Sequence, residues 1–175
     1  MGKKLLLVID MQNDFVSGSL GSKDAEAIVP RVIEKIKSFS GEIFYTRDTH
    51  FGNYLDTQEG KLLPIRHCIK GTYGHELVDS VKELVNGRPV NDKTTFGSPR
   101  IAETFAQIND TQGFIESVTL IGLCTDICVI SNALILKAFL PDAEIHVDSS
   151  CCAGTSREAH LRALEAMRAC QIFIE

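Results

Sequence analysis

The sequence lacks the features that mark membrane-spanning, nucleic-acid-binding and fibrous proteins. No apolar run among its 175 residues approaches the ~20 that cross a bilayer, so we expect no transmembrane segment and no membrane partner. Lysine and arginine are scattered and the net charge is -5, so we expect no basic surface for phosphates and no nucleic-acid partner. Repeats, low-complexity tracts and linkers are also missing, so we expect a single domain over residues 1–175.

The composition that is present is ordinary for a globular protein, with 44% hydrophobic and 23% charged residues. Six cysteines stand at positions 68, 124, 128, 151, 152 and 170. The first apolar run begins at Leu5 and stops at Asp10, which is too early for a signal peptide. We therefore predict a reducing, cytoplasmic location, where thiols serve as metal ligands, nucleophiles or small core residues.

Short apolar runs alternate with helical patterns along the whole chain. Strands are expected at 4–9, 42–45, 89–91, 117–121, 144–147 and 171–174. Helices are expected at 25–39, 75–85, 101–108, 124–139 and 156–169. Alternation of this kind predicts an α/β fold with three layers, in which helices cover both faces of a doubly wound, mostly parallel sheet.

Three chemically capable side chains fall near the expected strand ends, where such sheets bind ligands. Asp10 stops the first strand, Lys93 follows a short one, and Cys128 stands just past the strand at 117–121. Near a helix N-terminus the dipole and unpaired N–H groups favour a thiolate and can hold an oxyanion. Each residue also has a structural explanation, namely a turn cap, a solvated lysine and a core cysteine, and Cys124 is a rival thiol.

A second group suggests a metal site. Asp48 and His50 alternate by two, so they point to the same side of an extended segment, and Glu59 and His67 follow in the long polar segment 47–74. A segment of this length without a clean period tends to be functional. Two imidazoles with two carboxylates suit Zn²⁺, Mn²⁺ or Fe²⁺ better than Ca²⁺, and Cys68 is a lower-ranked soft ligand.

These segments resemble the isochorismatase-like cysteine hydrolases and, within them, the nicotinamidases. The resemblance is carried by residues 7–15, 46–50, 59, 64–67, 93, 122–129, 148 and 153–164, in the family's order. Its most specific part is the nucleophile segment at 122–129, Gly-Leu-Cys-Thr-Asp-Ile-Cys-Val, in which the second cysteine attacks. The resemblance implies the isochorismatase-like hydrolase fold.

The resemblance also implies a mechanism and a set of catalytic residues. Cys128, activated by Lys93, attacks a carboxamide carbon to give a thioester, and Asp10 serves as acid and base in turn. The backbone N–H groups of Cys124 and Cys128 form the oxyanion hole, and a cis peptide bond precedes Cys124. The remaining roles are carried over residue by residue: Asp48, His50, Glu59 and His67 hold one divalent ion, with zinc favoured, and Phe15, Leu63 and Phe96 line the substrate.

The sequence departs from the family pattern at two places. Many nicotinamidases use a third histidine at the metal, so Asp56 is an alternative to Glu59 as the fourth ligand. The chain also has no tryptophan, which some relatives place over the pyridine ring, and here Leu63 and Pro64 occupy that neighbourhood.

The leading hypothesis is a cytoplasmic amidohydrolase that converts nicotinamide to nicotinate. The alternative is a related cysteine hydrolase acting on another small amide, ureido or carbamoyl compound. A different class, a catalytically silent binding module with the same fold, would keep the metal ligands but leave Cys128 unreactive. Family members often pair into dimers or larger assemblies, so the resemblance also implies a homo-oligomer.

Overall fold

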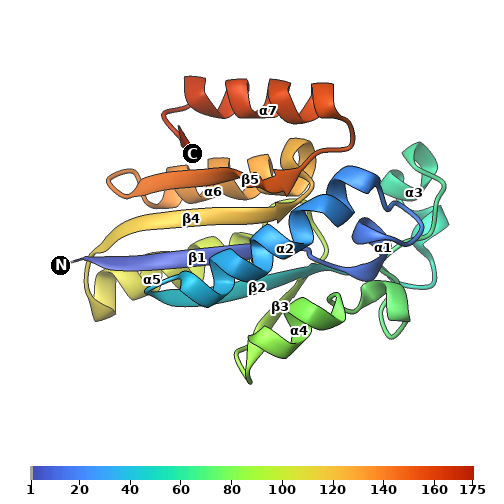
Figure 1. Ribbon diagram of the computed structural model, residues 1–175, viewed down its shortest axis with the longest axis horizontal. Coiled ribbons are helices and arrows are strands. Elements are labelled where there is room, and N and C mark those ends of the chain that lie inside the picture. Colours follow the sequence, from blue (N-terminus) through green and yellow to red (C-terminus); the bar gives the residue numbers. More distant parts are fainter. Residues whose placement is uncertain (1) are drawn as a thin grey trace.

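Six parallel strands form one sheet in the computed structural model, which describes residues 2–175 (Figure 1). The strands are β1 (Lys3–Ile9), β2 (Glu42–Asp48), β3 (Val90–Lys93), β4 (Ile115–Leu123), β5 (Glu144–Ala153) and β6 (Phe173–Ile174). Their order is β3-β2-β1-β4-β5-β6, and every neighbouring pair is parallel. The order reverses between β1 and β4, the point at which open α/β sheets bind ligands.

Helices cover both faces of this sheet, which confirms the predicted three-layer α/β fold. One face carries α2 (Lys23–Ser38) and α4 (Asp79–Val85), and the other carries α5 (Pro99–Gln112), α6 (Ile130–Phe139) and α7 (Arg157–Ala169). Alternate residues of β1 divide between the two layers: Leu5 and Leu7 pack toward α5 and α6, while Leu6 and Val8 pack toward α2. Continuous burial explains why β1 is apolar at every position from Leu5.

Serine side chains fix the starts of three helices. Ser22, Ser98 and Ser156 accept hydrogen bonds from backbone N–H groups three residues on, at 3.1, 3.2 and 3.1 Å. Each bond satisfies one of the free donors of a first helical turn, so the chain enters α2, α5 and α7 at defined residues. None of the described helices is both long enough and apolar enough to cross a membrane.

The expected helix over 124–139 is wrong in its first part. Thr125–Val129 form a π-helical turn, η3, and the α-helix begins only at Ile130. The strand expected to end at 147 instead continues to Ala153, because β5 follows β4 past a register shift and pairs Cys152 with Gly122. The polar residues 148–150 interrupt its apolar pattern, so sequence periodicity alone does not show this extension.

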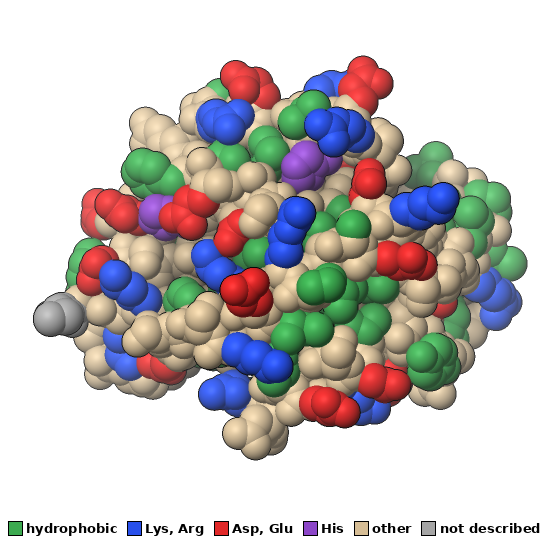
Figure 2. All heavy atoms as spheres, viewed as in Figure 1, with side chains coloured by type: hydrophobic (Ala, Val, Ile, Leu, Met, Phe, Trp, Pro, Cys, Tyr) green, Lys and Arg blue, Asp and Glu red, His purple; other side chains and the backbone are tan. Residues whose placement is uncertain are grey.

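The segment 47–74 is more ordered than its composition suggests. It contains η1 (Tyr54–Asp56), α3 (Gln58–Leu62) and the start of η2 (Tyr73–His75), and its first two residues complete β2. Tyr54 is fully buried, and its hydroxyl donates to the carbonyl oxygen of Leu63 at 2.9 Å. In Figure 1, α3 and α1 (Asn13–Val16) both lie at the end of the molecule toward which the strands point. On the face seen in Figure 2, basic and acidic side chains are interspersed.

Candidate active site

Three ionisable side chains from separate parts of the chain meet at the carboxyl edge of the sheet. Asp10 directly follows β1, Lys93 ends β3, and Cys128 lies in η3 beyond β4. Lys93 Nζ is 2.7 Å from Asp10 Oδ2 and donates a hydrogen bond to Cys128 Sγ at 3.5 Å. Thr46 Oγ1 donates to the other carboxylate oxygen of Asp10 at 2.7 Å, which holds the carboxyl group in place. The fold therefore brings together the three predicted catalytic residues at the switch point.

Burial dominates the ionisation of these groups. It raises the pKa of Asp10, and the opposing attraction of Lys93 does not cancel it. Burial also raises the pKa of the Cys128 thiol well above its usual value, with the Asp10 carboxylate acting in the same direction. Burial by itself would lower the pKa of Lys93, but its anionic neighbours, Asp10 first, raise it. The arrangement thus pairs a lysine cation with a neutral thiol and with a carboxyl group able to take up and return a proton.

The segment that carries Cys128 has a distinctive backbone. The peptide bond between Leu123 and Cys124 is cis, as the resemblance implies. The side-chain amide of Asn132 donates to the carbonyl oxygen of Cys128 at 2.8 Å and accepts from the Ser98 N–H at 3.0 Å. These two bonds connect η3, the turn that carries Cys128, to the start of α5, so they restrict the position of the thiol.

The predicted metal ligands also converge. His50 Nε2 lies 2.8 Å from Asp48 Oδ2 and 3.6 Å from Glu59 Oε1. His67 Nε2 lies 3.7 Å from each of the same two oxygens. Ligand atoms bound to zinc at about 2.0–2.2 Å stand somewhat over 3 Å apart in a tetrahedron, so these separations suit a first-row divalent ion.

The hydrogen bonds of the two imidazoles support this assignment. His67 Nδ1 lies 2.8 Å from the carbonyl oxygen of Ile65, which can only accept, so Nδ1 carries the proton and Nε2 offers its lone pair. Among the described residues, His50 Nε2 is buried without a hydrogen-bond partner, although Asp48 Oδ2 lies 2.8 Å from it. A buried ring nitrogen without a hydrogen bond, directed at two carboxylates and a second imidazole, fits a metal ligand.

The structure distinguishes between the alternative ligands. Glu59 reaches both imidazoles from α3, whereas Asp56 is an exposed residue of η1 with no ion pair to the cluster among the described residues. Cys68 is fully buried and burial raises its thiol pKa, so it is a core residue. The side chains close enough together to share one ion are Asp48, His50 and His67, and Glu59 adds a carboxylate 3.6–3.7 Å from both imidazoles. Asp48 connects the predicted metal ligands with the Asp10–Lys93–Cys128 group, because its Oδ1 lies 3.5 Å from Lys93 Nζ.

Gln12 positions the backbone of Asp48, a role that the sequence does not predict. Its side-chain amide donates to the carbonyl oxygens of Asp48 and His75, at 2.8 and 2.9 Å, and its oxygen accepts from the Asp48 N–H at 2.7 Å. Gln12 thereby joins the end of β1 to the end of β2 and fixes the backbone that carries Asp48. Only its place next to Asp10 and Met11 marks it in the sequence, and buried glutamine is not predictable from that pattern.

The predicted metal site and the thiol of Cys128 open into one cavity of about 820 Å³. Its wall includes the predicted nucleophile Cys128, the nearby Cys124 and the three expected substrate-lining residues Phe15, Leu63 and Phe96. The predicted metal ligands Asp48, Glu59 and His67 also line it. Asp10 and Lys93 lie behind this wall, at 0% and 4% exposure, so both side chains are shielded from bulk water.

The fold and this constellation define a class of proteins. Residues 4–175 match the family model described as the isochorismatase domain, and the chain therefore belongs to the isochorismatase family. A nicotinamidase of Saccharomyces cerevisiae is 26% identical, in an alignment that covers 75% of this chain and 80% of that protein.

Solved structures agree with this relationship. A pyrazinamidase/nicotinamidase from Streptococcus mutans superposes with a TM-score of 0.83 at 28% identity, over 99% of this chain and 100% of that one. The pyrazinamidase of Pyrococcus horikoshii in complex with zinc gives 0.80 at 27% identity, over 99% and 98%. The predicted family and its nicotinamidase subgroup are confirmed.

Proposed function

We propose that this protein is a nicotinamidase, which converts nicotinamide and water to nicotinate and ammonia. Its class, a hydrolase of carboxamide C–N bonds, is that of its nicotinamidase relatives. The observation that carries the proposal is the contact of Lys93 with both Asp10 and Cys128, next to a metal-ligand cluster that opens into the same cavity. We place the enzyme in the cytoplasm as a homo-oligomer, on the basis of its cysteines and its kinship.

In the proposed reaction Cys128 transfers its proton to Asp10 as the sulfur attacks the carboxamide carbon. Lys93 stabilises the developing thiolate, which offsets the burial that raises the pKa of this thiol. The N–H groups of Cys124 and Cys128 hold the oxyanion. Asp10 then protonates the departing ammonia and afterwards takes a proton from the water that hydrolyses the thioester. A carboxyl group with a raised pKa suits both proton transfers.

Binding is divided between the metal ligands and the apolar walls. Asp48, His50, Glu59 and His67 would hold one divalent ion, zinc by preference, and this ion would supply a Lewis acid for the pyridine nitrogen. Phe15, Leu63 and Phe96 enclose the ring and limit its orientations. Correct placement of a reacting carbon against a nucleophile can contribute several kcal/mol, so this positioning is a substantial part of the proposed catalysis.

A second candidate is a related cysteine hydrolase of another small amide, ureido or carbamoyl compound. The cavity volume supports this second candidate, because about 820 Å³ is near the upper end of the roughly 300–1,000 Å³ typical of small-molecule sites and leaves room for a larger substrate. Ammonia release from these compounds and from nicotinamide, at equal enzyme concentration, decides between the two candidates.

The decisive experiment measures ammonia release from nicotinamide by the wild type and by Cys128→Ala, each with and without a chelator. We expect turnover only for the metal-loaded wild type. Turnover that survives in Cys128→Ala would instead support attack by a metal-activated water.

A further inference from the structure

The cavity extends well past the space that one pyridinecarboxamide needs. Its wall runs from Asp48, at the end of β2, to Gly154 and Thr155, just after β5. These two ends are separated by β1 and β4, so they are three strand spacings apart, or roughly 14 Å. The metal ligands lie at the β2 end and Cys128 follows β4. A ring held at the ligands with its amide carbon at Cys128 leaves the β5 end empty.

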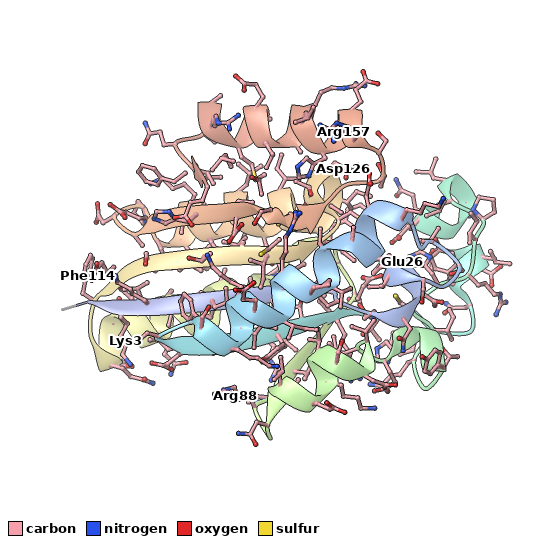
Figure 3. The ribbon with its side chains drawn as sticks, in the orientation of Figure 1. Lys3, Glu26, Arg88, Phe114, Asp126 and Arg157 are labelled. Atoms are coloured by element: carbon pink, nitrogen blue, oxygen red, sulfur yellow. The ribbon has the colours of Figure 1, made fainter. Side chains whose placement is uncertain are left out.

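This β5 end, which we call the far lobe, is formed by Leu20, Ser22, Ala25, Ile127, Gly154 and Thr155. They come from the start of α2, the nucleophile turn and the connection between β5 and α7. Figure 1 shows the start of α2 at the same edge of the molecule as the end of β5. Asp126 accepts hydrogen bonds from Thr155 N and Thr155 Oγ1, at 2.8 and 2.5 Å, which ties the lobe to the nucleophile turn. In Figure 3 Asp126 lies near Arg157, at the start of α7.

Both side-chain hydroxyls of the far lobe already take part in hydrogen bonds within the protein. The Ser22 hydroxyl accepts from the Ala25 N–H as the cap of α2, and the Thr155 hydroxyl donates to Asp126. The two carboxylates and the one imidazole in the cavity wall, Asp48, Glu59 and His67, belong to the metal end. Leu20, Ala25 and Ile127 therefore give the lobe an apolar character, which favours an apolar occupant.

The geometry of an amide decides which part of a substrate reaches this lobe. A secondary amide is planar and trans, so a substituent on its nitrogen points away from the acyl ring. With the ring at the metal ligands and the carbonyl carbon at Cys128, that substituent extends toward β5. We infer that the far lobe binds the amine-side substituent of a secondary amide, so that N-alkyl amides of a pyridinecarboxylic acid are also substrates. This inference rests on the proposed function.

The reaction follows the same steps as for the primary amide. The Cys128 sulfur bonds to the carbonyl carbon and the C–N bond breaks, while Asp10 delivers its proton to the leaving nitrogen. Water then hydrolyses the thioester. Amide and water are thereby converted to the carboxylic acid and a primary alkylamine, and no further reactant is needed.

The test measures binding of nicotinamide and its N-methyl, N-ethyl and N-propyl derivatives to zinc-loaded Cys128→Ala by calorimetry. We expect each methylene beyond the methyl group to tighten binding by about fourfold, the gain from burying one CH₂. Adding Ala25→Leu should fill the lobe and remove this gain. Leu20→Phe, at a less buried position, is a second substitution that should fill the lobe. The matched control is Ala27→Leu, an exposed position on the same helix, which keeps the gain.

Affinity that stays flat or falls along the series overturns the inference, as does equal behaviour of the Ala25→Leu and Ala27→Leu variants. Release of alkylamine from N-propylnicotinamide by the wild type supports it directly. Ammonia release from nicotinamide tests the proposed function separately. If that reaction is absent while affinity still rises with chain length, the function is wrong and the lobe remains a binding site.

Discussion

Lys93 and Asp10 form an ion pair of 2.7 Å whose side chains are 1% and 0% exposed. They come from β3 and from the end of β1, with β2 lying between these strands in the sheet. Two charges this deeply buried depend on each other, because neither can recover hydration when its partner is lost. The pair therefore contributes to the stability of the fold as well as to the chemistry of Cys128.

Removal of the lysine charge alone is expected to be severe. Lys93→Met leaves Asp10 buried without its cation and should lower the free energy of unfolding by about 3–5 kcal/mol. The double variant Lys93→Met/Asp10→Asn removes both charges and should recover much of that loss. Urea unfolding of the variants tests this, with the exposed Lys4→Met as the control for a surface ion pair. Equal instability of the single and double variants would contradict the interpretation.

Metal content should depend on the imidazoles of the cluster. His67→Ala removes a ligand whose orientation is fixed by Ile65, and we expect metal affinity to fall by more than about 100-fold, beyond the loss typical of an outer-sphere contact. Elemental analysis after dialysis against a dilute chelator measures the effect. Cys128→Ala and His146→Ala, which change a residue outside the cluster, should retain the metal. Retention by His67→Ala would argue against this ligand set.

Acid should weaken the attachment of α2 to β5. Burial alone would raise the pKa of Asp148, but hydrogen bonds from Lys35 and Ser150, at 2.8 Å each, hold it below its usual value. A lowered folded-state pKa means that the stabilisation is present above about pH 4, the ordinary aspartate value, and is lost as the pH falls through the folded value.

The matching measurement compares wild type and Asp148→Asn by urea unfolding at several pH values. At pH 7 we expect the variant to be less stable by about 1 kcal/mol, and this difference should shrink toward pH 2–3. Asp142→Asn, which changes an exposed aspartate, is the control and should show no such trend. A stability difference that grows on acidification would contradict this prediction.

Gly122 should not tolerate a side chain. A Cβ at this position would clash with the carbonyl oxygen of Ile9 on the neighbouring strand, and its φ of +117° is one that other residues rarely adopt. We expect Gly122→Ala to lower stability by more than about 3 kcal/mol, because backbone cannot move aside as a side chain can. Gly52→Ala, where a Cβ meets no atom within 4 Å, should be close to neutral in a thermal melt.

The sequence alone determined the fold class, the family and the candidate site residues. Alternating strand and helix patterns are local properties, and the switch-point rule directs attention to Asp10 and Cys128 because both follow strands. The roles of the site residues stay predictions, since they depend on chemistry that the experiments above measure.

Only the tertiary structure decided the contacts between residues far apart in the chain. It placed Glu59, and not Asp56, at the imidazoles, and it showed Gln12 bridging to Asp48 and His75. It also showed that β5 continues to Ala153 and that the cavity extends to the far lobe beside the end of β5. Periodicity and motifs report what each segment prefers by itself, whereas these features follow from the pairing and packing of segments that approach only when the chain is folded.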